Sequence, residues 1–301
     1  MKKLIAVILC CFVLCFALVL FLGHGEAGQP DVTGPEQLGH GTMPPEPTAG
    51  DASAALPDDT RPDDAVVPDA AKPTVPDEET DSQAGSRPQK PSVLDVSRMG
   101  QYLVPVNQSV IYNDELQEYV DSQCSIYNNQ IRLTADREGD YYRSGKVVSN
   151  IAFLYGDFTF RIHTLSGSGL FPAIWMLPET GAVLPEVDIY ECIGSFPTTI
   201  YGVHHFMNGG VKEREFFDTD LPAATQEYTL SFHWDEQSLV WYLNGQPLQT
   251  FTEQVPDKPM YIIMNLAVGG SWAQPPTEDT SFPSSFQVEV LEFSPRNIRS
   301  R

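Results

Sequence analysis

Apolar and polar residues alternate along the last two thirds of the chain. The alternation is clearest where Tyr228, Leu230, Phe232 and Trp234 are separated by polar residues. A period of two points successive side chains to opposite faces of a strand, so one face of this segment is expected to be buried. No window of a dozen residues shows the 3.6-residue period of an amphipathic helix. The pattern therefore predicts a domain built from strands.

The same pattern recurs in short segments separated by Gly, Pro and Asn turns. The expected strands are 131–135, 146–155, 158–165, 173–177, 187–193, 200–206, 228–234, 239–243, 260–268 and 286–293. Asn244-Gly245, which follows one of them, is the strongest short hairpin signal. Many short strands at near-regular spacing are typical of a β-sandwich of the jelly-roll type or of a barrel. Such folds offer a concave face, and an open cleft on that face suits a polymer.

The N-terminal segment, residues 1–27, has the pattern of an export signal. Lys2 and Lys3 precede the apolar run 4–22, and small residues follow it. The run is 19 residues long, close to the ~20 residues that span a bilayer, so an uncleaved membrane tether through residues 4–22 is the alternative. Both interpretations predict an exported protein, either secreted or tethered at the outer face of the cell membrane.

Residues 28–91 differ in composition from both flanking regions. They contain 12 prolines and 13 acidic residues, and no Phe, Trp or Tyr. Such a segment cannot bury enough apolar surface to offset the entropy of ordering it, so we expect a disordered linker. The alternating region that follows, residues 92–301, is then a single globular domain.

The charge balance limits the classes of partner, and the cysteine content limits the possible disulfides. The chain has 40 acidic and 18 basic residues, a formal net charge of −22. This balance argues against a nucleic-acid partner and favours a neutral or weakly charged substrate. Of the five cysteines, only Cys124 and Cys192 lie in the globular part. A disulfide and two free thiols are both compatible with their spacing.

Three carboxylates lie within six residues of an otherwise apolar strand. In a regular strand Glu186 and Asp188 share a face, and Glu191 points to the other. One extra residue, a β-bulge, would bring Glu191 onto the same face. Three acids on one wall suit retaining glycoside hydrolysis, with one carboxylate as nucleophile, one as acid and then base, and the third separating their pKa values. The alternatives are a strand whose acids face water and a divalent-cation site.

Segments before and after the acids carry residues that suit sugar recognition. Aromatic faces stack on sugar rings, and amides and imidazoles bond to their hydroxyls. The segments 169–178, 202–206 and 265–272 contain such residues. Segments 113–119, 144–146 and 155–162 precede them in the chain. Taken in chain order, all of these segments resemble the family 16 glycoside hydrolases and, within that family, the laminarinase-like endo-β-1,3-glucanases.

The resemblance implies an all-β, concanavalin-like jelly-roll sandwich with a concave substrate cleft. It implies an endo-acting, retaining hydrolase of laminarin-type β-1,3-glucan, with Glu186 as nucleophile, Glu191 as general acid/base and Asp188 bonded to the nucleophile. The substrate-binding residues that it implies are Trp175, Arg161, His204, Asn265 and Trp272. His204 is preferred to His205 because it shares the strand phase of Gly202.

Two positions depart from the family pattern. Phe171 stands where Trp is common, and Glu289 stands where the last strand more often has Asp. A structural Ca²⁺ on the convex face is therefore an alternative rather than an expectation, and no cofactor is expected to be required. Hydrolysis of another β-glycan, such as mixed-linkage glucan or galactan, and a non-catalytic glucan-binding sandwich remain the alternatives. We expect a monomer whose partner is a polysaccharide.

Overall fold

The structure is a computed structural model and describes residues 93–109 and 112–301. The predicted signal or tether, 1–27, and the predicted linker, 28–91, lie outside the described residues. The described part consists mostly of strands, with two short 3₁₀ helices, η1 (Val96–Gln101) and η2 (Asp121–Gln123). No helix in this part is long and apolar enough to cross a membrane.

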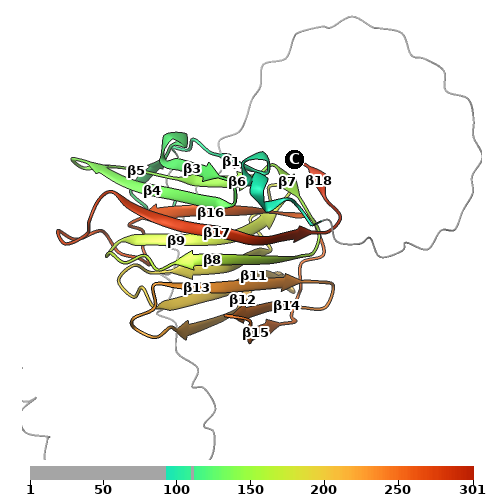
Figure 1. Cartoon of the computed structure of the whole chain (residues 1–301). Helices are drawn as coiled ribbons and strands as arrows, with labels where there is room; N and C mark the ends of the chain where they lie inside the picture. Colours follow the sequence, from blue (N-terminus) through green and yellow to red (C-terminus); the bar gives the residue numbers. More distant parts are fainter. Residues whose placement is uncertain (1–92, 110–111) are drawn as a thin grey trace, which may run out of the picture. The chain divides into compact units, whose positions relative to one another are not determined.

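Two large sheets make up the domain, together with one short strand pair (Figure 1). The seven-stranded sheet has the order β1 (Leu103–Pro105), β6 (Lys146–Ser149), β16 (Met260–Val268), β9 (Leu170–Pro178), β10 (Glu186–Cys192), β11 (Thr199–Asn208), β12 (Val211–Asp220). The nine-stranded sheet has the order β15 (Gln246–Phe251), β14 (Leu239–Leu243), β13 (Glu227–Trp234), β8 (Gly156–His163), β17 (Ser284–Pro295), β4 (Gln130–Glu138), β5 (Tyr141–Ser144), β2 (Gln117–Tyr119), with β3 (Cys124–Tyr127) paired to β4. The short pair is β18 (Arg299–Ser300) with β7 (Ile151–Ala152).

The two large sheets pack face to face over one core. On β8 every second residue is buried, including Phe158, Phe160 and Ile162, as the period of two requires. Across the core, the ring of Tyr190 on β10 stacks on that of Phe286 on β17, with centroids 5.6 Å apart. The predicted all-β jelly-roll sandwich is confirmed. The inner faces build the core, which leaves the outer face of the seven-stranded sheet available for a site.

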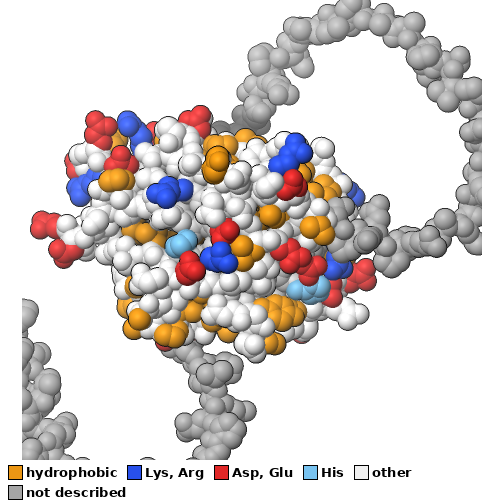
Figure 2. Space-filling view, viewed as in Figure 1, with side chains coloured by type: hydrophobic (Ala, Val, Ile, Leu, Met, Phe, Trp, Pro, Cys, Tyr) orange, Lys and Arg blue, Asp and Glu red, His pale blue; other side chains and the backbone are white. Residues whose placement is uncertain are grey.

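Two stretches differ from the strands expected from the sequence. The expected strand 146–155 is divided into β6 and β7, which pair with different sheets. The long strand β12 had no counterpart in the prediction, because its residues are mostly polar and partly exposed and do not alternate. It lies at the edge of its sheet, where charged residues are common. Figure 2 shows acidic and basic side chains interspersed over one face of the molecule, with hydrophobic side chains in separate groups.

Within the described part of the chain, both cysteines are free thiols. Cys124 lies on β3 in the nine-stranded sheet, and Cys192 is buried on β10 in the other sheet. Burial raises the pKa of the Cys192 thiol to about 12 and that of Cys124 to about 11. High thiol pKa values of this kind belong to structural rather than reactive cysteines.

Candidate functional site

Strand β10 carries the three carboxylates and contains the β-bulge that their spacing predicts. Asp188 and Glu191 are three residues apart, but their partners on β9 are only two apart, and the pairing with β11 shifts in the same way. Between them Ile189 and Tyr190 are both fully buried in the core instead of alternating. Glu191 is thereby returned to the face that carries Asp188.

A cleft of about 650 Å³ lies on the outer face of the seven-stranded sheet. Glu186, Asp188 and Glu191 line it together with Trp175 and Asn265, so the structure brings five of the predicted site residues into one cleft. The other lining residues come mainly from β6, β9, β16 and the segment that precedes β2: Val106, Gln108, Tyr112, Asn113, Glu115, Tyr119, Lys146, Val148, Phe171, Ala173, Leu177, Val183, Tyr261, Ile263 and Arg301.

The middle carboxylate differs in environment from its two neighbours. Asp188 is only 4% exposed, whereas Glu186 and Glu191 are partly exposed. Burial raises the pKa of Asp188 well above its usual range, and the charges of Glu191 and Glu186 raise it further against the opposing effect of Lys212. Adjacent carboxyl groups with different solvent access can have different pKa values, so that one is protonated while another is ionised at the same pH. An acid that works beside a nucleophile requires this difference.

The histidine beside the acids is His205, which corrects the prediction of His204. The Nε2 atom of His205 lies 3.9 Å from Oε1 of Glu186 and 3.8 Å from Oδ2 of Asp188. His204 pairs with Val187 and points into the core, where burial and the charge of His205 lower its pKa to about 4. His204 does share the strand phase of Gly202, as the prediction assumed, but that phase faces the core.

Arg161 lies outside the cleft, which corrects a second prediction. It is on β8 in the nine-stranded sheet, and its neighbours in that strand, Phe160 and Ile162, fill the core, so its side chain is on the outer face. There it pairs with Glu289 and, at 4.0 Å, with Glu227.

Glu289, which stands where the family more often has Asp, lies on the same outer face. One carboxylate oxygen of Glu289 accepts a hydrogen bond from Asn129, at 3.1 Å, and the other pairs with Arg161. With both oxygens bonded to nitrogen donors, and one of these donors a guanidinium, Glu289 does not fit the role of a Ca²⁺ ligand in this arrangement.

Trp175 and Asn265 are held together in the wall of the cleft. The indole nitrogen of Trp175 donates a hydrogen bond of 2.7 Å to Oδ1 of Asn265. The side-chain nitrogen of Asn265 in turn donates to the hydroxyl of Tyr119 at 3.1 Å. This chain of hydrogen bonds fixes the orientation of the Trp175 ring, which is only partly buried and can present its face to a ligand.

Trp272 packs against one end of the same wall rather than lining the cleft directly. Its ring centroid is 5.3 Å from that of Phe171, a lining residue, and 4.9 Å from that of Tyr201. Its buried indole nitrogen has no hydrogen-bond partner among the residues described. Tyr201 pairs with Glu191 in the β-ladder, so this aromatic group lies at the Glu191 end of the cleft.

Besides Arg301, two charged lining residues, Glu115 and Lys146, were missed by the sequence analysis. Glu115 accepts a 2.5 Å hydrogen bond from Gln117, and burial raises the pKa of its carboxyl group. Lys146 donates to Gln108 at 3.0 Å and lies 5.8 Å from the centre of the Trp175 ring. Their segments, 113–119 and 144–146, contribute to the family resemblance, but neither residue lies in a pattern that indicates chemistry.

Comparisons with known proteins identify similar sequences. The model of glycosyl hydrolases family 16 matches residues 110–282, more than half of the chain. The glucan endo-1,3-beta-glucosidase A1 of Niallia circulans is 30% identical over 219 residues, covering 60% of this chain and 32% of that protein. The endo-1,3-1,4-beta-glycanase EglC of Rhizobium meliloti (strain 1021) is 29% identical over 206 residues, covering 60% and 43%. This chain thus matches less than half the length of either relative.

Solved structures of similar proteins share the fold. The laminarinase catalytic domain from Thermotoga maritima MSB8 matches with a TM-score of 0.52 and 27% identity, covering 59% of this chain and 83% of that one. The endo-beta-1,3-glucanase from Pyrococcus furiosus matches with a TM-score of 0.54 and 26% identity, covering 64% and 89%.

Proposed function

Because the chain belongs to the glycosyl hydrolases family 16, we propose that it is an endo-acting, retaining hydrolase of β-1,3-glucan. The observation that carries the proposal is the bulge in β10, which turns Glu191 onto the face of the sheet where Asp188 and Glu186 line the cleft. The names of the relatives from Niallia circulans, Thermotoga maritima and Pyrococcus furiosus support β-1,3-glucan as the substrate.

The proposed reaction is a double displacement. The carboxylate of Glu186 attacks the anomeric carbon, the glycosidic bond breaks, and its electron pair leaves with the oxygen, which takes the proton of Glu191. Glu191, now a carboxylate, then removes a proton from water as the water oxygen attacks the same carbon and releases Glu186. Both residues end in their starting protonation states. Asp188, buried beside them, hydrogen-bonds the nucleophile and keeps the pKa values of the two glutamates apart.

The substrate is tested by an assay of reducing ends released from laminarin, mixed-linkage glucan, agarose and carrageenan. We expect the highest rate on laminarin, with long oligosaccharides appearing first because the enzyme is endo-acting. A preference for mixed-linkage glucan would shift the proposal toward the activity named for EglC. Binding of glucan without release of reducing ends would show a non-catalytic sandwich and overturn it.

The roles of the two glutamates are tested by Glu186→Ala and Glu191→Gln. Both variants should lose laminarin hydrolysis by on the order of a thousandfold or more. On a dinitrophenyl glycoside, whose leaving group needs no proton, Glu191→Gln should recover glycosylation of Glu186, whereas Glu186→Ala should not. Glu289→Gln, an acid on the outer face of the other sheet, is the matched control and should retain activity.

We also propose that the protein acts outside the cytoplasm. The basic residues and apolar run of segment 1–27 support export, and a polysaccharide substrate is too large to enter a cell intact. Fractionation of producing cells should find the protein in the medium or at the outer surface of the membrane. Retention of the full chain in the cytoplasm would contradict this proposal.

A further inference from the structure

A histidine and two of the carboxylates converge beside the cleft, and the imidazole takes no part in the bond changes of the proposed hydrolysis. One ligand atom from each of Glu186, Asp188 and His205 lies within 4.8 Å of the other two. His205 Nε2 is 3.9 Å from Glu186 Oε1 and 3.8 Å from Asp188 Oδ2. This group combines an imidazole with carboxylates, and its members come from two paired strands rather than from a surface loop.

The spacing of these atoms suits a small tetrahedral ion. Zn²⁺ binds imidazole nitrogen and carboxylate oxygen at about 2.0–2.2 Å, so adjacent ligands on a tetrahedron lie roughly 3.4 Å apart. The two distances measured from His205 exceed this value by about half an ångström. Rotation of the partly exposed Glu186 side chain can shorten the first, and a small movement of the His205 ring can shorten the second.

The backbone already holds the ligands in position. Glu186 and His205 are direct partners in the ladder between β10 and β11, and Asp188 is two residues further along the same face. Asp188 and His205 are 4% and 8% exposed, so an ion bound to them would be largely shielded from bulk water. Glu191 adds negative charge next to Asp188 and Lys212 opposes it, while Arg214 on β12 is the ladder partner of His205.

We propose that Glu186, Asp188 and His205 form a binding site for a divalent transition-metal ion of the zinc class, and that an ion bound there inhibits the enzyme. Imidazole favours Zn²⁺, Cu²⁺ or Ni²⁺ over Mg²⁺ and Ca²⁺, which need more oxygen ligands than these three side chains supply. A fourth position remains for water on the cleft side. Inhibition would follow because the metal–oxygen bond engages the carboxylate of Glu186. The inhibition rests on the proposed function, whereas the binding does not.

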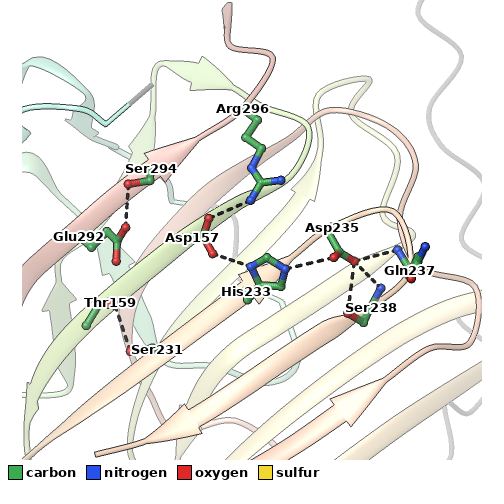
Figure 3. Close-up of polar contacts among 10 residues, drawn as sticks. All are labelled: Asp157, Thr159, Ser231, His233, Asp235, Gln237, Ser238, Glu292, Ser294 and Arg296. Carbon is green, nitrogen blue, oxygen red and sulfur yellow. Dashed lines mark hydrogen bonds and ion pairs between the residues drawn. The ribbon is translucent and has the colours of Figure 1, made fainter. Parts of the chain in front are cut away.

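A second histidine with two carboxylates provides a matched control (Figure 3). On the outer face of β13, Nδ1 of His233 is 2.5 Å from Asp157, and its Nε2 is 3.2 Å from Asp235. The two carboxylates lie at opposite ring nitrogens, so a single ion cannot reach both of them together with the imidazole. Each cluster thus combines one imidazole with two carboxylates, but the two clusters differ in geometry.

Calorimetric titration of the full chain with ZnCl₂ tests the site. We expect wild type to bind one Zn²⁺ at its tightest site and to show no comparable heat with MgCl₂. His205→Gln and Asp188→Asn should each weaken that site at least about tenfold, whereas His233→Gln should leave it unchanged. Thermal unfolding in EDTA establishes that each variant is folded. If only one of His205→Gln and Asp188→Asn is folded, the zinc affinity of that variant alone tests the site.

Absence of a tight site in wild type, or unchanged affinity in His205→Gln or Asp188→Asn, would overturn the proposal. An equal loss of zinc affinity in His233→Gln would also overturn the proposal, because any histidine with two carboxylates would then bind zinc whatever its geometry. If zinc binds as expected but laminarin is not cleaved by the metal-free protein, the proposed function fails and the metal site stands. If laminarin is cleaved and zinc does not bind, the proposed function stands and the metal site fails.

Discussion

The indole nitrogen of Trp241 on β14 donates a hydrogen bond of 2.9 Å to the carbonyl oxygen of Ile189 on β10. The two residues belong to opposite sheets, so the bond crosses the core. A bulge removes backbone groups from the regular ladder, and a buried carbonyl then needs another partner. This hydrogen bond therefore stabilises, from the core side of the sheet, the bulged backbone that directs Glu191 toward the cleft.

Replacing Trp241 with Phe should impair both stability and catalysis. The variant keeps an aromatic ring but leaves the Ile189 carbonyl buried without its donor, at a cost of about 1–3 kcal/mol in the free energy of unfolding. Because the bulge becomes less fixed, we expect kcat on laminarin to fall by roughly tenfold with a smaller change in KM. Urea unfolding and steady-state kinetics measure the two effects.

Trp234→Phe is the matched control for that variant. Trp234 is also fully buried, and its indole nitrogen donates to the carbonyl of Pro256 at 3.1 Å, a bond that does not involve β10. It should lose similar stability but keep its kcat. Equal losses of kcat in both variants would mean that the bulge gains no particular support from Trp241.

Exchanging each of the adjacent histidines for Leu should produce opposite effects. Neither ring nitrogen of the fully buried His204 has a hydrogen-bond partner within the described structure. His204→Leu removes two unsatisfied polar atoms and should raise the free energy of unfolding by about 1 kcal/mol, with activity retained. His205→Leu removes the imidazole next to Glu186 and Asp188 and should lower kcat. Loss of activity in the first variant alone would restore His204 as the residue that acts in the cleft.

The outer-face cluster around His233 predicts a loss of stability at alkaline pH (Figure 3). The hydrogen bond to Asp157 is the main cause that raises the pKa of His233, partial burial opposes it, and Asp235 adds to it. A raised pKa in the folded state means that the stabilisation is fully present below the unfolded value of 6.5 and is lost as the pH rises through the folded value.

Chemical unfolding between about pH 5.5 and 9 measures this contribution. The free energy of unfolding of wild type relative to His233→Gln should decrease as the pH rises through that range. Asp157→Asn should remove most of the same pH dependence, since it removes the main partner. A constant difference between wild type and His233→Gln would contradict the assignment.

The position of Arg161 predicts that it is dispensable for turnover. Arg161→Gln breaks ion pairs on the outer face of the nine-stranded sheet, where the side chain is 39% exposed, and should keep kcat/KM on laminarin within about twofold. Asn265→Ala, in contrast, removes the partner of Trp175 and should lower kcat/KM by about tenfold. A larger loss in Arg161→Gln than in Asn265→Ala would place Arg161 in the substrate site after all.

The strands and the bulge could be predicted because local sequence contains their cause. Period-two alternation requires one buried face, and three acids in a short apolar strand are costly unless they share an exposed face. The choice between His204 and His205 could not be made in this way, because alternation assigns two adjacent residues to opposite faces without saying which face is the core. The assignment depends on the register with Val187.

Contacts between distant segments explain the remaining differences. Arg161 alternates correctly on its strand, but its strand belongs to the sheet that does not form the cleft, and strand order is not encoded in local periodicity. Glu115 enters the cleft because the segment before β2 reaches the end of β16 through the bridge between Glu115 and Gly269, and Lys146 enters it because β6 pairs with β16. The Trp241–Ile189 bond likewise joins residues that no local pattern relates.

We propose that Glu186 and Glu191, brought to one face by the bulge, work as a retaining pair. Retention requires two inversions at the anomeric carbon, and therefore a covalent intermediate on Glu186. Proton NMR of the reducing end, followed from the first seconds of laminarin cleavage by the full chain, measures the outcome directly. If the two glutamates form a retaining pair, the β-anomer forms first and converts to the α-anomer only by mutarotation. Initial formation of the α-anomer would show inversion and rule out this mechanism.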